Sequence, residues 1–108
     1  MKINYNWTIS ALDCKVKEGT LENIVNIVHW RLRASNDNFT TETYSSTAMP
    51  LPSGDNFTAY NDLTKEQVIQ WLETILDSEL IEIKNRLIDN LFLLENPIQV
   101  TPKLPFNN

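Results

Sequence analysis

The spacing of hydrophobic residues changes partway along this chain. In residues 2–10 hydrophobic and polar positions alternate, and this two-residue period is typical of a half-buried β-strand. After Thr64 the hydrophobic residues recur at the three- and four-residue spacing of an amphipathic helix. Strands in the first half and helices in the second half predict an α+β fold, in which the helices pack on one face of a sheet.

Three strands that form an antiparallel meander are predicted in the first half. The first covers about residues 2–10, the second about 21–34 and the third about 39–46. Gly19 is expected to supply a positive φ in the first turn, and residues 35–38 form the second turn. The second strand is hydrophobic on both faces at its centre, which predicts a central position in the sheet. The more polar third strand is expected at an edge.

A β-bulge or a bend is predicted near Ala11. Hydrophobic residues occupy odd positions up to Ile9 and even positions afterwards. The even positions are Leu12, Cys14 and Val16. Because successive side chains of a strand point to opposite faces, an extra residue is needed to keep both sets on the buried face.

Two helices are predicted after the connection at residues 48–61. The first begins at Thr64, whose side chain is the expected N-cap, and Gln67 completes a capping box. It ends near residues 77–78, which can also cap the second helix. The second helix stops at residues 96–97, where Pro follows Asn.

The second helix has a wide hydrophobic side. Its main row is Leu80, Ile83, Leu87, Leu91 and Leu94, and that row is widened by Ile81, Ile88 and Phe92. Two helices and a small sheet need a narrower stripe than this. Prolines make the segment after the helix extended. The chain is therefore predicted to consist of a single α+β domain at residues 1–97 and an extended, proline-containing C-terminal arm at residues 98–108.

The composition fits one domain with its own core. The chain has 108 residues, of which 42% are hydrophobic, and its single cysteine cannot form an intramolecular disulfide. No charged and apolar leader precedes the first strand, and no apolar run approaches the roughly 18 residues of a membrane span. These features predict a soluble protein made in a reducing cytoplasm.

The negative charge is concentrated in the second half. The net charge is −5; residues 1–54 hold five basic and five acidic residues, whereas residues 55–108 hold four and nine. Direct nucleic-acid binding is disfavoured, because neutralising phosphates needs a basic surface. The acidity is expected to solubilise exposed helix faces.

Residues that carry chemistry are few. Cys14 and His29 could form a thiol nucleophile and its base, but both lie in predicted strands, and we interpret them as structural. One His and one Cys do not supply the ligand cluster that zinc needs. The oxygen-bearing residues Asp55, Asn56, Asn61 and Asp62 do not follow the calcium-loop pattern. The sequence therefore predicts no enzymatic activity, no cofactor and no metal.

The three tryptophans are interpreted as packing residues. Trp7, Trp30 and Trp71 could form exposed platforms for bases or sugars, but such platforms usually come with basic residues. Arg31 and Arg33 flank Trp30 and make one small basic spot. Core or interface packing is the favoured role for all three indoles.

Several short stretches resemble a known group of proteins. They are residues 4–9 (Asn-Tyr-Asn-Trp-Thr-Ile), 12–14 (Leu-Asp-Cys), 28–31 (Val-His-Trp-Arg), 62–64 (Asp-Leu-Thr) and 71–73 (Trp-Leu-Glu). The chain resembles a family of short, functionally unassigned proteins encoded by tailed bacteriophages, especially those of marine cyanobacteria. The similarity extends over nearly the whole chain, although Phe106 stands where the family has Trp. None of the stretches is a catalytic signature, so the resemblance implies a phage origin and no mechanism.

These observations favour a non-enzymatic virion protein, such as a capsid-associated, neck or tail accessory component. It is expected to be made in the host cytoplasm, to end in the virion, and to pack against other phage proteins or copies of itself, without membrane or direct nucleic-acid contact. The expected partner-binding residues are Ile98, Val100, Leu104 and Phe106 on the arm, with Ile81, Ile88 and Phe92 on the second helix. The alternative is an acidic inhibitor that imitates DNA and occupies a host nucleic-acid-binding protein. Its candidate carboxylates are Glu66, Glu73, Asp77 and Glu82.

Overall fold

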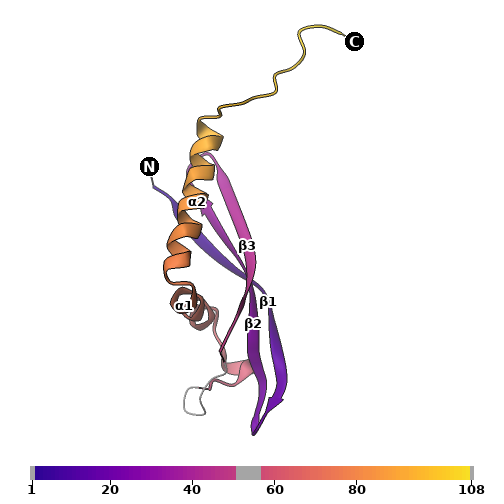
Figure 1. Cartoon of the computed structure of the whole chain (residues 1–108), viewed down its shortest axis with the longest axis vertical. Helices are drawn as coiled ribbons and strands as arrows, with labels where there is room; N and C mark the ends of the chain where they lie inside the picture. Colours follow the sequence, from indigo (N-terminus) through magenta and orange to yellow (C-terminus); the bar gives the residue numbers. More distant parts are fainter. Residues whose placement is uncertain (1, 51–56, 108) are drawn as a thin grey trace.

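The computed structural model describes residues 2–50 and 57–107. Three antiparallel strands are followed by a short 3-10 helix and two α-helices, which confirms the predicted α+β fold class (Figure 1). The elements are β1 (Asn4–Glu18), β2 (Leu21–Ser35), β3 (Thr40–Ala48), η2 (Tyr60–Asp62), α1 (Lys65–Leu76) and α2 (Ser78–Glu95). The strand order is β1-β2-β3, so the sheet is a meander with β2 in the centre and β3 at an edge, as predicted.

The β1–β2 pair contains two bulges. The register shifts between Ile9 and Ala11, which makes Ser10 the extra residue on β1 and confirms the predicted bulge. A second shift, which the sequence did not indicate, makes Asn26 the extra residue on β2 and restores the first register. Bulges increase the local twist of a strand. Here the first one keeps both Ile9 and Leu12 packed against the core.

The core lies between one face of the sheet and the two helices. Its buried residues are Val25, Val28, Trp30, Leu32 and Ala34 on β2, Val68, Leu72 and Leu76 on α1, and Leu80, Ile83, Leu87 and Leu91 on α2. The rings of Trp7 and Trp30 meet edge to face with their centroids 5.3 Å apart, and Trp71 packs half-buried against the same cluster. The predicted packing role of the tryptophans is confirmed.

The turn between β2 and β3 is closed by Asn36. Its Oδ1 accepts hydrogen bonds from the backbone N–H groups of Asn38 and Phe39, at 2.9 and 2.8 Å, which is the behaviour that favours Asn in turns. Its Nδ2 donates to Glu95 at 3.1 Å. This contact holds the C-terminal end of α2 beside the turn and so fixes the place where the arm leaves the domain.

The start of α1 is set by Thr64. Its Oγ1 accepts a hydrogen bond from the backbone N–H of Gln67 at 3.2 Å, so the predicted N-cap is confirmed. The Gln67 side chain donates to Thr58 at 2.9 Å and does not return to Thr64, so the capping box is only half formed. Asp77 joins the two helices with φ at 42°, and its side chain makes no cap hydrogen bond to α2. The predicted helix boundary is therefore confirmed and Asp77 stands at the N-cap position of α2, but it does not cap the helix through its side chain.

Two residues that the sequence placed with the buried sets are exposed. Val16 is 78% exposed, because the distal end of the β1–β2 hairpin extends beyond the two α-helices (Figure 1). Leu94 is 45% exposed, because it lies in the last turn of α2, at the end of the sheet. In both cases the hydrophobic spacing correctly predicted a strand or a helix. The strand or helix then continues beyond the part of the molecule that packs against it.

Candidate interaction surface

The outer side of α2 carries exposed hydrophobic residues. Ile81 and Phe92 are 62% and 63% exposed, and Ile88, between them on the same side, is half-buried. Lys84 shares this side, and its Nζ lies 4.9 Å from the centre of the Tyr5 ring. Lys84 therefore reaches toward β1, whose inward residues are only half-buried. Ile81 and Phe92 are left uncovered on this side of the helix.

The C-terminal arm is exposed along its length. Ile98 is 90% exposed, and Val100, Leu104 and Phe106 are each more than half exposed. In Figure 1 the segment after α2 is extended and runs away from the body of the domain. All four arm residues predicted to bind a partner are thus presented to solvent, together with Ile81 and Phe92 on α2, whereas Ile88 is partly covered.

Sequence reasoning missed part of this surface. Leu93 and Leu94 are both 45% exposed and link the outer side of α2 to the arm. Leu94 had been assigned to the core row, and Leu93 lies on neither predicted row. The sequence did contain a sign of this surface, since nearly every position of the final helical turn is hydrophobic. An amphipathic helix that ends in solvent would be polar there.

The dimensions of the molecule agree with a surface that has a partner. The accessible surface is 8051 Å², whereas a compact monomer of 12.5 kDa exposes about 6,200 Å². The radius of gyration is 19.4 Å, compared with about 13 Å for a compact domain of this length. The excess of about 1,900 Å² is larger than one side of a standard protein–protein interface, about 800 Å².

The open face of the sheet carries a hydrogen-bonded Asp–His–Ser group that sequence reasoning did not find. His29 is bonded through Nε2 to Oδ2 of Asp13, at 2.8 Å, and through Nδ1 to Oγ of Ser46, at 2.5 Å. A carboxylate accepts, so Nε2 is the donor to Asp13; the donor between Nδ1 and the Ser46 hydroxyl depends on the tautomer of the ring. The three residues come from three neighbouring strands on an exposed face, and the group ties those strands together.

Cys14 and His29 do not form a nucleophile and base. Cys14 packs against the core cluster, whereas His29 lies on the opposite, open face. Burial raises the pKa of the Cys14 thiol, and the negative charge of Asp13 raises it further. A thiol with a raised pKa is a poor nucleophile at neutral pH. The structural interpretation of both residues therefore agrees with their positions.

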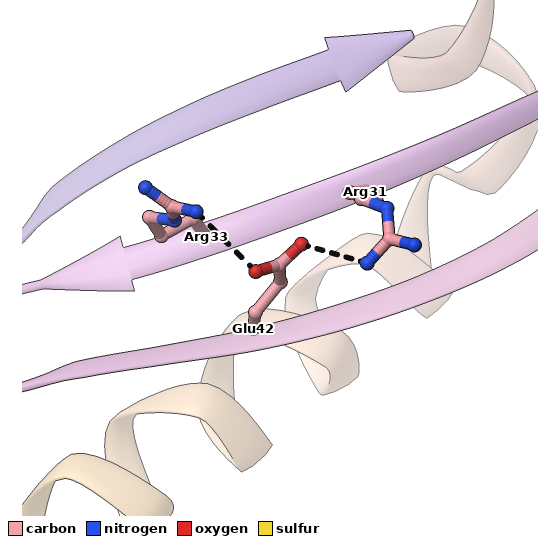
Figure 2. A network of polar contacts seen from close by, with 3 residues as sticks. All are labelled: Arg31, Arg33 and Glu42. Carbon is pink, nitrogen blue, oxygen red and sulfur yellow. Dashed lines mark hydrogen bonds and ion pairs between the residues drawn. The ribbon is translucent and has the colours of Figure 1, made fainter. Parts of the chain in front are cut away.

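The predicted basic spot is partly neutralised by Glu42. Figure 2 shows the Glu42 carboxylate on β3 between the two guanidinium groups of β2. Arg31 donates to Oε1 at 3.2 Å, and Arg33 donates to Oε2 at 3.5 Å. The hydrogen bond from Arg31, followed by the positive charges of Arg33 and Arg31, holds the pKa of Glu42 below its usual range. This group leaves the open face without a strong field of one sign.

The acidic residues considered for DNA imitation are exposed but do not form one row. Glu66 and Glu73 lie on α1, Glu82 lies on α2, and Asp77 lies at the junction where the chain changes direction. Figure 1 shows α1 nearly end-on while α2 runs along the long axis, so the two helices do not continue each other in one line. The arrangement does not follow the regular spacing of a phosphate backbone.

Neither a metal cluster nor a membrane helix is found among residues 2–50 and 57–107. No group of three or more His, Cys, Asp or Glu side chains in these ranges could hold a metal ion. No helix in them is long and apolar enough to cross a bilayer. Of the oxygen-bearing residues considered as cation ligands, Asp55 and Asn56 lie outside the described residues.

The fold and its exposed surface define a small α+β protein with an apolar helix side and a projecting arm. The chain belongs to the family defined by a domain of unknown function, DUF7936, whose model matches residues 2–106. The match includes the arm as far as Phe106, so the arm is part of the family's domain. No curated protein and no solved structure matches the chain.

Proposed function

We propose that this chain is a non-enzymatic structural or accessory component of a tailed-bacteriophage particle, such as a capsid-associated, neck or tail protein. It acts by packing its arm and the outer side of α2 against other phage proteins or against copies of itself. It is made in the host cytoplasm and ends in the virion. It needs no cofactor and contacts neither membrane nor nucleic acid directly.

The exposure of the arm is the observation that carries this proposal. Four large hydrophobic side chains, Ile98, Val100, Leu104 and Phe106, face solvent on a segment outside the domain core. Fully burying one such side chain in an interface stabilises it by about 1.5–3 kcal/mol. A soluble monomer gains nothing from their exposure, and contiguous exposed hydrophobic residues mark interaction sites.

The prolines of the arm support the same role. Pro97, directly before the arm, and Pro102 and Pro105 within it restrict the conformations of the free segment. A restricted segment loses less conformational entropy when it docks in an extended form, so more of the contact energy is retained as affinity. Arms of this kind suit assemblies in which each subunit reaches onto a neighbour.

The phage assignment rests on the resemblance of residues 4–9, 12–14 and 28–31 to small proteins of tailed bacteriophages. Those three stretches lie on β1 and β2, where they supply half-buried and buried core residues such as Trp7 and Trp30. The shared residues are therefore ones that build the fold. This supports common descent more than a shared catalytic site.

Mass spectrometry of density-purified virions from the source phage tests the proposal. The protein is expected at a copy number comparable with a known minor virion protein and to stay with the particles through a second gradient. A non-structural phage protein of similar abundance in the lysate is the control, and it should be lost. Absence of this chain from particles that retain their other minor proteins would refute the virion role. Its recovery with a host nucleic-acid-binding protein would then favour the inhibitor alternative.

A further inference from the structure

The free edge of β3 lacks the features that keep sheet edges from pairing. The strand is 9 residues long, contains no proline or bulge, and has Glu42 as its only charged residue. The opposite edge strand, β1, has the Ser10 bulge and several charged residues toward its distal end. Edge strands of monomeric proteins are usually blocked by bulges, prolines or charges. By this criterion β1 is protected from Ser10 onward, whereas β3 has no such protection beyond the single charge of Glu42.

Two hydrogen bonds at the ends of β3 define which backbone groups are free. The N–H of Met49 donates to the carbonyl of Asn26 at 2.8 Å, and the N–H of Asn36 donates to the carbonyl of Phe39 at 3.0 Å. Because the backbone groups of successive residues point to opposite sides of a strand, the odd-numbered residues between 39 and 49 bond to β2. The even-numbered residues point their N–H and C=O groups outward. They are Thr40, Glu42, Tyr44, Ser46 and Ala48.

We propose that β3 pairs with β3 of a second copy, antiparallel and about a two-fold axis at Tyr44, to form one sheet continuous across both copies. In this register Tyr44 faces Tyr44 of the second copy, Glu42 faces Ser46, and Thr40 faces Ala48. Every outward backbone group of the strand is then paired, which gives about ten hydrogen bonds between the copies. The site is separate from the arm and from the outer side of α2, so the inference goes beyond the proposed function.

Side-chain charges disfavour the register whose axis lies at Glu42, and an aromatic pair favours the axis at Tyr44. An axis at Glu42 would place two carboxylates directly opposite each other, which is destabilising. An axis at Tyr44 places each Glu42 opposite a neutral Ser46. Tyr44 is 72% exposed and lies on the open face with the Arg31 guanidinium 5.1 Å from its ring centre, so the central pair is two aromatic residues. Cross-strand aromatic pairs stabilise a sheet.

The helix-facing side of the edge is also suited to a second strand. There β3 presents hydroxyl side chains at Thr43 and Ser45, which face each other in this register and can hydrogen-bond across the new strand pair. A cavity of about 410 Å³ lies between β3 and the helices, with Thr43, Ser45, Ile75 and Arg86 among its lining residues. The helices thus leave room beside the edge.

Sedimentation velocity of the full chain over a range of concentrations tests the inference. The wild type is expected to dimerise reversibly. Tyr44→Lys places two ammonium groups on the axis and is expected to give folded monomers, with its circular dichroism spectrum unchanged. Asn4→Lys adds the same charge at an exposed position of β1, outside the proposed contact, and should dimerise like the wild type.

A second pair of variants tests the register and does not depend on Tyr44. Ser46→Lys and Ser46→Glu both remove the Ser46 hydroxyl that bonds to His29, and the charge that each adds beside His29 acts within one copy, so it is the same in monomer and dimer. In the Ser46→Lys dimer, the new ammonium group of each copy would face Glu42 of the other copy, which gives two opposite-charge pairs. In the Ser46→Glu dimer, the two pairs would be of like charge. The dimer dissociation constant of Ser46→Lys is expected to be roughly two- to thirty-fold below that of Ser46→Glu at low salt.

A wild type that stays monomeric up to millimolar concentration would overturn the inference, and so would equal dissociation constants for the two Ser46 variants. If dimers persist in Tyr44→Lys but disappear on deletion of residues 98–108, the arm carries the self-contact; this overturns the β3 pairing and leaves the proposed function standing. If the β3 dimer forms but the protein is absent from virions, the proposed function fails and the pairing stands.

Discussion

The indole of Trp30 on β2 donates a hydrogen bond to Oγ1 of Thr47 on β3, with 2.8 Å between the two atoms. Trp30 is only 2% exposed, so water has little access to this N–H group. The bond joins the largest buried side chain of the central strand to the edge strand. It satisfies a donor that would otherwise be buried without a partner.

Replacing Thr47 by Val is therefore expected to lower the free energy of unfolding by about 1–3 kcal/mol, because the variant leaves the indole N–H unpaired. For a domain of this size that corresponds to a Tm lower by roughly 4–8 °C for each kcal/mol. Urea unfolding followed by tryptophan fluorescence measures it. Thr43→Val is the control: Thr43 lies on the same face of β3 but does not bond to Trp30. Equal decreases in unfolding free energy for the two variants would show that the hydrogen bond to Trp30 does not contribute to stability.

Gly19 is a second position where a single substitution is expected to change stability. Its φ is +62°, in the left-handed region that residues with a Cβ adopt at a cost, while nothing lies within 4 Å of a Cβ added there. Gly19→Ala is expected to cost about 1 kcal/mol through backbone strain alone, and Gly19→Asn is expected to cost less, because Asn tolerates this region. Thermal unfolding of the two variants checks the order. A more stable Gly19→Ala would mean that the turn has another conformation.

These two positions show what the sequence could and could not predict. Gly19 was predictable, because a glycine in a short polar turn has few other reasons to occur. The Ser10 bulge and the Thr64 N-cap were predictable because each leaves a pattern in adjacent residues. The strand order was predictable because short turns join consecutive strands. The Trp30–Thr47 bond depends on the β2–β3 register, which no local pattern specifies.

The same limit explains the errors. Periodicity assigned Val16 and Leu94 to buried faces, but burial also depends on how far each element extends beyond its neighbours. The second bulge, at Asn26, was not predicted because the middle of β2 is hydrophobic on both faces, so a change of phase leaves no trace there. The Asp13–His29–Ser46 group was missed because it joins three strands through two registers.

Acid is expected to remove the contribution of Glu42 to stability. Its pKa is lowered in the folded protein, first by the hydrogen bond from Arg31, so the folded state favours the ionised form. Such a contribution is complete above the pKa of Glu in the unfolded chain, about 4.3, and is lost as the pH falls through the lower folded value. The unfolding free energy of the wild type should therefore fall more steeply below pH 4.3 than that of Glu42→Gln. Parallel curves between pH 2 and 6 would contradict the contact.

The Cys14 thiol is expected to react slowly with a disulfide reagent in the native state. Burial and the neighbouring Asp13 raise its pKa, so less thiolate is present at any given pH, and the thiolate is the reactive form. The rate with Ellman's reagent at pH 8 should be below that of the same chain unfolded in urea with matched reagent. A native rate equal to or above the unfolded rate would place Cys14 in a reactive, exposed setting and reopen a catalytic role.

The arm is expected to be dispensable for folding. The side chains of Ile98, Val100, Leu104 and Phe106 lie outside the core cluster, so a chain ending at residue 97 should unfold with nearly the same free energy as the full chain. Urea unfolding of the two proteins compares them. A large loss of stability on truncation would assign the arm to the domain's own core.

Incorporation of the protein into particles tests the central claim most directly. Cells infected with a phage that lacks the gene would supply both the full chain and a chain without residues 98–108, at equal levels and with distinct mass tags. Purified virions would then be analysed by quantitative mass spectrometry. Packing through the arm predicts that the full chain is present in virions and that the truncated chain is depleted at least several-fold, although it folds. Equal incorporation of both chains, or the absence of both, would contradict it.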